Sequence, residues 1–266
     1  MAEITATLVR ALREETGQGM MECKRALKQT GGDKEAARDL LRKKGLLTAE
    51  RKAGRATSEG LIGIRINEAR TGGVMVEVRC ETDFCARNEV FRDMVQAVTD
   101  MAAAGPEGKV QATAEMDAAV KGALAKIREN MSFARGIRIS APCVAGYLHH
   151  NGKVGVLVGV EGPLSEEMLA DLCMHVAFAD PMGINPQDIP ERVIAKEREI
   201  ALAQAMEAGK PQPIAQKMVE GKIRKFIEAN ALVEQPFVKD DKKKVKDVLG
   251  KARVAAMARL AVGVDP

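Results

Sequence analysis

Residues 61–79 read LIGIRINEARTGGVMVEVR, and residues 144–162 repeat this pattern as VAGYLHHNGKVGVLVGVEG. Each stretch holds two apolar runs separated by a glycine-containing turn, which is the pattern of a β-hairpin. Gly63 corresponds to Gly146 and Gly73 to Gly155, so only the length of the turn differs between the copies. The sequence therefore predicts a weak internal repeat of two β-hairpins.

Helical patterns follow both hairpins. After the first hairpin Asn88 can cap a helix, and a second helix is expected near residues 112–128, before a strand-like segment at 135–142. The apolar face of the capped helix holds Phe91, Val95, Val98 and Met101, and the helix after the second hairpin has Leu169, Leu172 and Val176. These patterns predict an α+β fold whose sheets are half covered by helices.

The remaining segments define the domain organisation. Glycines separate three short helices in the first fifty residues, with Asp33 as an N-cap and Gly45 as a C-cap of the third. We assign residues 1–52 to a small three-helix bundle and residues 53–60, within the charged stretch 50–60, to a linker. The core then divides into an N-subdomain and a C-subdomain, at residues 61–142 for the first and residues 143–188 with 232–264 for the second.

Residues 189–231 have a different character. Two charge-rich helical segments, at residues 191–208 and 214–228, are joined by the turn GKPQP. Helices joined by so short a turn run antiparallel, and their narrow apolar stripes leave most of their surface to water. We expect a projecting helical hairpin, after which an apolar tail rejoins the second sheet.

The composition disfavours several function classes. Five scattered cysteines without a CxxC pair and only three histidines indicate buried free thiols, no bound metal and no cofactor. The glycine-rich phosphate-binding loops and the nucleophile elbow of hydrolases are absent from the sequence. Neither a signal pattern nor a run of ~18 apolar residues occurs. We therefore expect a cytoplasmic binding protein rather than an enzyme or a membrane protein.

The stretch ETDFCARN, at residues 81–88, places an acid beside one of only six phenylalanines. Residue type alone favours a core position for Phe84, because phenylalanine is mostly buried and an earlier helix start would align it with Phe91. If Asn88 is the cap, Phe84 is free to point outward. The residues by themselves leave both positions open.

Two stretches together, REETGQGMMECKRAL at residues 13–27 and ETDFCARN, resemble the elongation factor Ts family. This family consists of bacterial nucleotide-exchange factors for elongation factor Tu, and the resemblance covers essentially the whole chain. It implies a UBA-like (ubiquitin-associated-like) N-terminal bundle, two related core subdomains and an inserted antiparallel coiled coil. The chain departs from the family at Gln18, where a small residue is usual, and at Cys85, where valine is common. We also expect no counterpart of the extra C-terminal module that some members carry.

The resemblance implies partner-binding residues in three places. The first set contacts elongation factor Tu near its magnesium and phosphate site and consists of Thr82, Asp83, Phe84 and Cys85. In this position Phe84 would point outward. The second set holds the GTPase domain and consists of Leu12, Met20 and Met21; of the two methionines, we expect one buried and one exposed. His149 would contact another domain of the partner, and the alternative is a solvated turn histidine.

Other functions remain as alternatives. Residues 1–55 hold 13 Lys and Arg against 8 Asp and Glu, which suits either a nucleic-acid-binding protein or a solvated helical surface. A UBA-type bundle also suits a general adaptor. Scarce aromatic residues disfavour direct nucleic-acid binding, and we expect none. The sequence leaves homodimerisation open.

Overall fold

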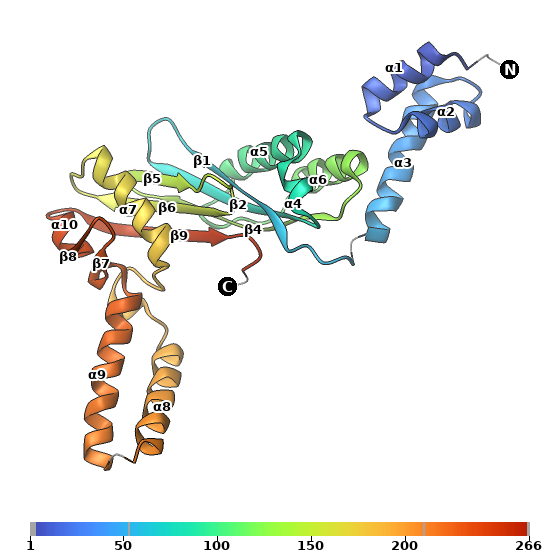
Figure 1. The fold of residues 1–266 in the computed structure, drawn as a ribbon. Helices are drawn as coiled ribbons and strands as arrows, with labels where there is room; N and C mark the ends of the chain where they lie inside the picture. The colour runs from blue at the N-terminus through green and yellow to red at the C-terminus, as the bar shows by residue number, and fades with distance from the viewer. Residues whose placement is uncertain (1–3, 53, 210, 265–266) are drawn as a thin grey trace. The chain divides into compact units, whose positions relative to one another are not determined.

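A computed structural model describes residues 4–52, 54–209 and 211–264 as a mixture of helices and strands (Figure 1). The described chain divides into two compact units. Unit 1 holds the described residues of 1–65, 74–138 and 260–266, and unit 2 holds those of 66–73 and 139–259. The predicted α+β class is thus confirmed, whereas the finer division into domains stays a prediction.

Unit 1 begins with three helices, α1 (Ala6–Thr16), α2 (Met20–Gln29) and α3 (Lys34–Lys52). Thr5 caps α1 by accepting a hydrogen bond from the Leu8 amide, and Gly17 ends it at a positive φ of 68°. Asp33 caps α3 by accepting from the Ala36 amide at 3.0 Å, as the sequence predicts. The three helices share a small buried core that consists of Val9, Leu12, Cys23, Ala26, Leu27, Ala37 and Leu41.

The end of α3 corrects one prediction. Gly45 does not terminate the helix, which continues to Lys52, so the charged stretch 50–60 is helical up to residue 52. A glycine inside a helix costs only about 1 kcal/mol relative to alanine, and good helix-forming residues on both sides can offset that cost. A lone glycine is therefore a weak stop signal unless the chain turns there.

A four-stranded sheet forms the centre of unit 1, in the order β1 (Glu59–Ile66), β2 (Gly72–Cys80), β4 (Met131–Ser140), β3 (Gly108–Lys109). The helices α5 (Glu89–Ala103) and α6 (Ala114–Ile127) cover one face of this sheet (Figure 1). Val76 and Val78 of β2 pack there against Phe91 of α5 and Met116 of α6. The hairpin and both helices were predicted; the short strand β3 was not.

A buried carboxylate connects the segment 261–263 to this sheet. Glu77 on β2 is fully buried, and its side chain accepts hydrogen bonds from Arg79 Nε and Arg135 Nε, both at 2.6 Å. The same carboxylate accepts from the Gly263 amide at 2.9 Å, and Arg135 donates to the Ala261 carbonyl at 3.0 Å. Two arginines and a backbone amide thus compensate the buried charge, as burial of a carboxylate requires.

The centre of unit 2 is a three-stranded sheet in the order β5 (Cys143–Leu148), β6 (Val154–Glu161), β9 (Arg253–Ala261). Strand β5 pairs antiparallel with β6, with Gly146 opposite Leu157, which confirms the second hairpin. Strand β9 is the apolar tail predicted to rejoin this sheet. The helices α7 (Glu166–Ala179) and α10 (Val245–Leu249) pack against the sheet, and a small hairpin of β7 (Pro236–Phe237) and β8 (Asp240–Lys244) was not predicted.

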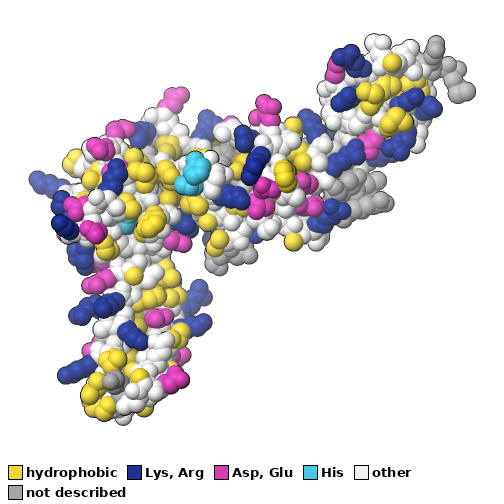
Figure 2. All heavy atoms as spheres, in the orientation of Figure 1, with side chains coloured by type: hydrophobic (Ala, Val, Ile, Leu, Met, Phe, Trp, Pro, Cys, Tyr) yellow, Lys and Arg dark blue, Asp and Glu magenta, His cyan; other side chains and the backbone are white. Residues whose placement is uncertain are grey.

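The helical hairpin of unit 2 consists of α8 (Glu191–Glu207) and α9 (Gln212–Asn230), which run side by side (Figure 1). Short 3₁₀ turns at Pro186–Asp188 and Leu232–Glu234 flank it. The buried residues in the seam between its helices are mainly small: Ala201, Ala205, Ala215, Val219 and Ile223. Larger apolar side chains stay exposed among charged ones over its surface (Figure 2). Most of the hairpin surface is exposed, as expected, but the seam is not the predicted apolar stripe, because Ile200, Met206, Ile214 and Met218 are exposed.

A buried histidine joins three segments of unit 2 at the base of this hairpin. The Val238 amide donates to His175 Nδ1 at 3.2 Å, so the ring must carry its proton on Nε2, which lies 3.0 Å from Gln235 Oε1. Gln235 in turn donates to the carbonyls of Ala229 and Ala179. Burial lowers the pKa of His175, so the neutral ring is the stable form in this network.

Candidate functional site

The acidic-aromatic segment forms a one-turn helix between β2 and α5. This helix, α4, spans Asp83–Arg87, and Thr82 caps it by accepting a hydrogen bond from the Cys85 amide at 3.2 Å. Asn88 caps α5 by accepting from the Val90 amide at 2.9 Å. Because α5 begins only after Asn88, Phe84 does not share its core face. Phe84 is 80% exposed, and the alternative of a core position is wrong.

Asp83 lies beside Phe84 at the start of α4. Its carboxylate is partly exposed and pairs with Arg87, one turn later, at 3.0 Å. An exposed pair of this spacing contributes only about 0.3–0.5 kcal/mol. Asp83 therefore remains available to accept hydrogen bonds from another molecule.

Cys85 points in the opposite direction, into the core of unit 1, and is 2% exposed. A hydrogen bond with Cys80, together with burial, raises the pKa of the Cys85 thiol far above its usual range. Cys80 also donates to the Thr82 carbonyl at 3.2 Å. The Cys85 thiol thus acts as a small apolar side chain on the inner side of α4, where the valine expected from the resemblance would also fit.

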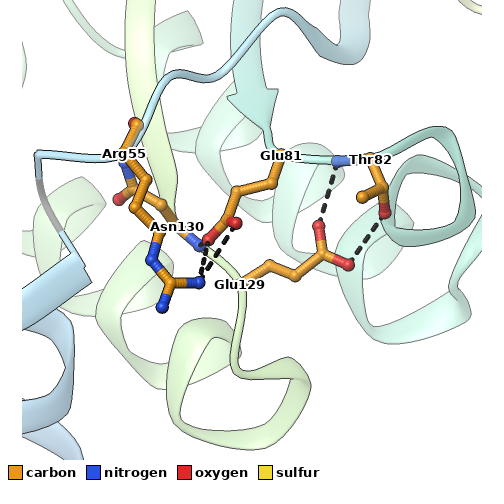
Figure 3. Close-up of polar contacts among 5 residues, drawn as sticks. All are labelled: Arg55, Glu81, Thr82, Glu129 and Asn130. Atoms are coloured by element: carbon orange, nitrogen blue, oxygen red, sulfur yellow. Dashed lines mark hydrogen bonds and ion pairs between the residues drawn. The ribbon is translucent and has the colours of Figure 1, made fainter.

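Two carboxylates, those of Glu81 and Glu129, hold the segment before α4, and neither contact was predicted from the sequence (Figure 3). Glu129, just after α6, accepts from the Thr82 amide at 3.0 Å and from the Thr82 hydroxyl at 2.8 Å. Glu81 accepts from the Asn130 amide at 2.6 Å and from the Arg55 guanidinium at 3.3 Å. No motif links residues so far apart along the chain, so only the fold reveals these contacts.

The turn between α1 and α2 presents the two methionines. Met20 is 52% exposed and Met21 is 64% exposed, so the expectation of one buried and one exposed methionine is wrong. Both stand in the first turn of α2, whose buried positions begin with Cys23. Leu12 is fully buried in the bundle core. It can support a contact surface formed by the methionines but cannot itself reach a partner.

Gln18, one of the two departures from the family, has a defined contact within unit 1. Its side-chain amide donates to the Ala125 carbonyl of α6 at 2.7 Å. Glu22 of α2 forms an ion pair with Arg128, which follows α6. The longer side chain at position 18 therefore binds the helical bundle to α6, a contact that a small residue would lack.

His149 lies in the hairpin turn of unit 2. Its Nδ1 is 2.9 Å from the Tyr147 hydroxyl, and its ring lies 4.2 Å from that of His150, measured between centroids. A surface depression of about 250 Å³ lies beside it and is lined by Tyr147, His149, Val154, Met174, Ala177 and Phe178. Phe178 is 80% exposed and was not predicted. Phe178 lies at the end of α7, where too few residues follow for an apolar periodicity to show which side of the helix is exposed.

The described residues contain no group of three or more His, Cys, Asp or Glu side chains arranged to hold a metal ion. Within the same part of the chain, no helix is both long and apolar enough to cross a membrane.

Sequence comparisons identify close relatives over most of the chain. A family profile described as Elongation factor TS matches residues 81–264. The chain is 46% identical to elongation factor Ts of Actinobacillus succinogenes, an alignment that covers 99% of this chain and 92% of the relative. It is 41% identical to elongation factor Ts of Aquifex aeolicus, over 91% and 90% of the two chains. The chain therefore belongs to the elongation factor Ts family.

Proposed function

We propose that this protein is a guanine-nucleotide exchange factor that binds elongation factor Tu and promotes release of GDP during translation elongation. Family membership supports the activity, and one structural observation supports the mechanism: Phe84, an aromatic side chain 80% exposed at the tip of a short helix. An exposed phenylalanine next to an available carboxylate is typical of a binding surface rather than of a solvated loop.

The fold supports a finer domain description as part of this proposal. The helices α1, α2 and α3 form a bundle small enough for a UBA-like module, and each predicted hairpin is followed by a helix that covers its sheet. The small residues in the seam of α8 and α9 suit an antiparallel coiled coil. We retain the proposed boundaries of residues 1–52, 61–142, 143–188 with 232–264, and 189–231.

The mechanism proceeds through the metal of the partner. Mg²⁺ requires near-ideal octahedral geometry at short distances, so a small displacement of its ligands in elongation factor Tu weakens its binding. Phe84, inserted between helices of the partner, would hold that displacement. Complete burial of such a ring contributes roughly 1.5–3 kcal/mol. This free energy is available because almost none of it is used in folding.

Asp83 has two compatible roles beside this ring. Its carboxylate can accept amide hydrogen bonds from the displaced backbone of the partner, or disturb the water shell of the metal. Exchange then follows from linkage. A protein that binds the nucleotide-free partner more tightly than the GDP-bound partner must lower the affinity of the partner for GDP by the same ratio. No covalent bond forms or breaks, so the protein acts as a binding factor rather than as an enzyme of covalent chemistry.

Further contacts would secure the complex away from the nucleotide. Met20 and Met21 provide an adaptable apolar surface for the GTPase domain, with Leu12 supporting them from the bundle core. His149 would contact another domain of the partner, and Cys85 would support Phe84 from within. Translation elongation takes place in the cytoplasm, and we propose that the protein acts there.

Release of fluorescent GDP tests this function. Elongation factor Tu is preloaded with the labelled nucleotide, unlabelled GDP is added in excess, and the protein is supplied in trace amounts. Release should accelerate many-fold with the wild-type protein and less with Asp83→Ala. Asp93→Ala, which removes an exposed carboxylate of α5, is the matched control and should retain wild-type activity. Unchanged release with the wild-type protein would refute the proposal.

A further inference from the structure

The loops before α4 and after α6 exchange carboxylate contacts in both directions (Figure 3). Glu129 of the second loop accepts two hydrogen bonds from Thr82 of the first, at 2.8 and 3.0 Å. Glu81 of the first loop accepts the Asn130 amide of the second, at 2.6 Å. Neighbouring residues in each loop thus bind neighbouring residues in the other. This reciprocal pairing fixes the two loops against each other along their backbones.

The helix that carries Phe84 needs such external support. Helix α4 has only five residues, and a helix of one turn does not persist on its own hydrogen bonds. The Phe84 ring contributes little packing, because it is 80% exposed. On the inner side, Cys85 and Ala86 are buried and hold the helix at its middle. The direction of its first turn therefore depends on what holds Thr82.

Glu129 holds Thr82 at two atoms, the backbone amide and the hydroxyl. The same hydroxyl accepts from the Cys85 amide as the N-cap of α4. The Thr82 hydroxyl has a single hydrogen, and it donates that hydrogen to Glu129. The direction of the hydrogen is therefore fixed, and the oxygen lone pairs remain to accept from the Cys85 amide. A charged acceptor also makes this bond stronger than one to a neutral group. Glu129 thereby orients both the cap and the chain entering α4.

The path of the chain after α6 places Glu129 there. Arg128 ends α6 in the left-handed region, with φ of 67°, and its amide donates to the Leu124 carbonyl at 2.8 Å. This turn directs the next residue towards the α4 segment. Asn130 is buried and donates its side-chain amide to the Arg55 carbonyl at 2.7 Å, which secures the turn from its other side.

We propose that Glu129 is a positioning residue for nucleotide exchange, holding Thr82 at two atoms so that Phe84 points in the direction the partner requires. This role rests on the proposed function, because Glu129 would act through Phe84 and the start of α4. Displacement of an interacting group by about 1 Å can cost 10²-fold in rate. Loss of Glu129 should accordingly slow release of GDP in the assembled complex and leave formation of the complex largely unchanged.

Glu129→Ala and Glu129→Gln test this role in the GDP-release assay. The alanine variant should lower the maximal release rate about tenfold or more, while the factor concentration for half-maximal release stays within about twofold. The glutamine variant keeps one acceptor oxygen, so it should recover part of the lost rate. Glu107→Ala, which removes an exposed loop carboxylate of the same unit, is the control and should match the wild type. All rates are expressed per folded molecule, from unfolding curves.

A double variant separates positioning from a general structural role. If Glu129 acts by orienting the first turn of α4, then adding Glu129→Ala to Phe84→Ala should slow release much less than Glu129→Ala slows it alone. Additive losses would overturn the proposal, and so would a normal maximal rate in both single Glu129 variants. If elongation factor Tu releases GDP as fast with Phe84→Ala as with the wild-type protein, the role proposed for Phe84 is wrong instead. Should Glu129→Ala fold poorly, the same comparisons are made with Glu129→Gln.

Discussion

Phe84 and Phe91 are seven residues apart in one continuous segment and have opposite environments, the first exposed and the second buried. Phe91 of α5 is fully buried in the core of unit 1, whereas Phe84 of α4 is 80% exposed. The separation arises at Asn88, which ends one helix and caps the next. One aromatic ring therefore belongs to the core of unit 1, and the other is exposed at its surface.

Replacement of Phe84 should affect exchange and spare folding. Phe84→Ala should change the free energy of unfolding by less than about 0.5 kcal/mol, because an exposed ring contributes little to the folded state. Loss of its burial in the complex, worth roughly 1.5–3 kcal/mol, should slow GDP release roughly 10- to 150-fold. Urea unfolding and the release assay measure the two effects separately.

Phe91→Ala provides the comparison for this pair. It should lower the free energy of unfolding by about 3–5 kcal/mol, since it leaves a cavity in the core of unit 1. Its exchange activity per folded molecule should stay near that of the wild type. A large loss of stability in Phe84→Ala with normal exchange per folded molecule would show that the two rings have been assigned the wrong way round.

The buried carboxylate of Glu77 should be essential for stability. Glu77→Ala removes the buried carboxylate that Arg79 and Arg135 share, and loss of one partner from such a cluster costs about 3–5 kcal/mol. Denaturant unfolding should show this loss. Glu59 lies on the neighbouring strand β1 and is only half-buried, so Glu59→Ala should cost much less. Equal effects of the two substitutions would contradict the role given to Glu77.

His175 should make stability depend on pH. The folded state lowers the pKa of this ring, so as the pH falls below about 6.5 the unfolded chain takes up the proton first. The free energy of unfolding should therefore decline from that pH down to the lower pKa of the folded protein. Unfolding curves between pH 8 and 5 measure the decline, and in His175→Gln that part of the slope should disappear whatever its absolute stability. An unchanged slope in the variant would contradict the prediction.

The buried thiols should resist alkylation. Burial raises the pKa of Cys173 to about 12, and the contact with Cys80 and burial raise that of Cys85. The thiolate is the reactive form, so iodoacetamide at pH 8 should modify the half-buried Cys143 of the native protein well before these two. Peptide mass spectrometry after timed quenching measures the order, and all sites should react in denaturant. Equal rates for Cys85 and Cys143 in the native protein would contradict the buried position.

Much of the fold could be predicted because it depends on local patterns. The paired glycines of the two repeats locate the hairpins, and the caps at Asp33 and Asn88 locate helix starts that the structure confirms. Periodic apolar residues locate the buried faces of α5, α6 and α7. They do not locate the seam of α8 and α9, where small residues are buried and several larger apolar ones are exposed. Gly45 is misleading because a glycine signals a helix end only when tertiary structure makes the chain turn there.

The polar contacts behind the site could not be predicted. Glu129 and Thr82 are 47 residues apart, and Glu77 and Gly263 are 186 apart, with no periodicity to connect them. Charged residues are mostly exposed, so composition argues against burying Glu77. Met20 has helical spacing to Cys23 and Leu27, yet α2 begins directly after Gly19, and both Met20 and Met21 precede its first buried position.

The metal dependence of GDP release tests the central claim most directly. The rate of GDP dissociation from elongation factor Tu is measured with saturating wild-type protein or Phe84→Ala, in millimolar Mg²⁺ and again in excess EDTA. If Phe84 acts by displacing the ligands of the metal, the variant should be much slower than the wild type in Mg²⁺ and nearly equal to it in EDTA. A defect of the same size in both conditions would contradict the claim, because the ring would then act on something other than the metal site.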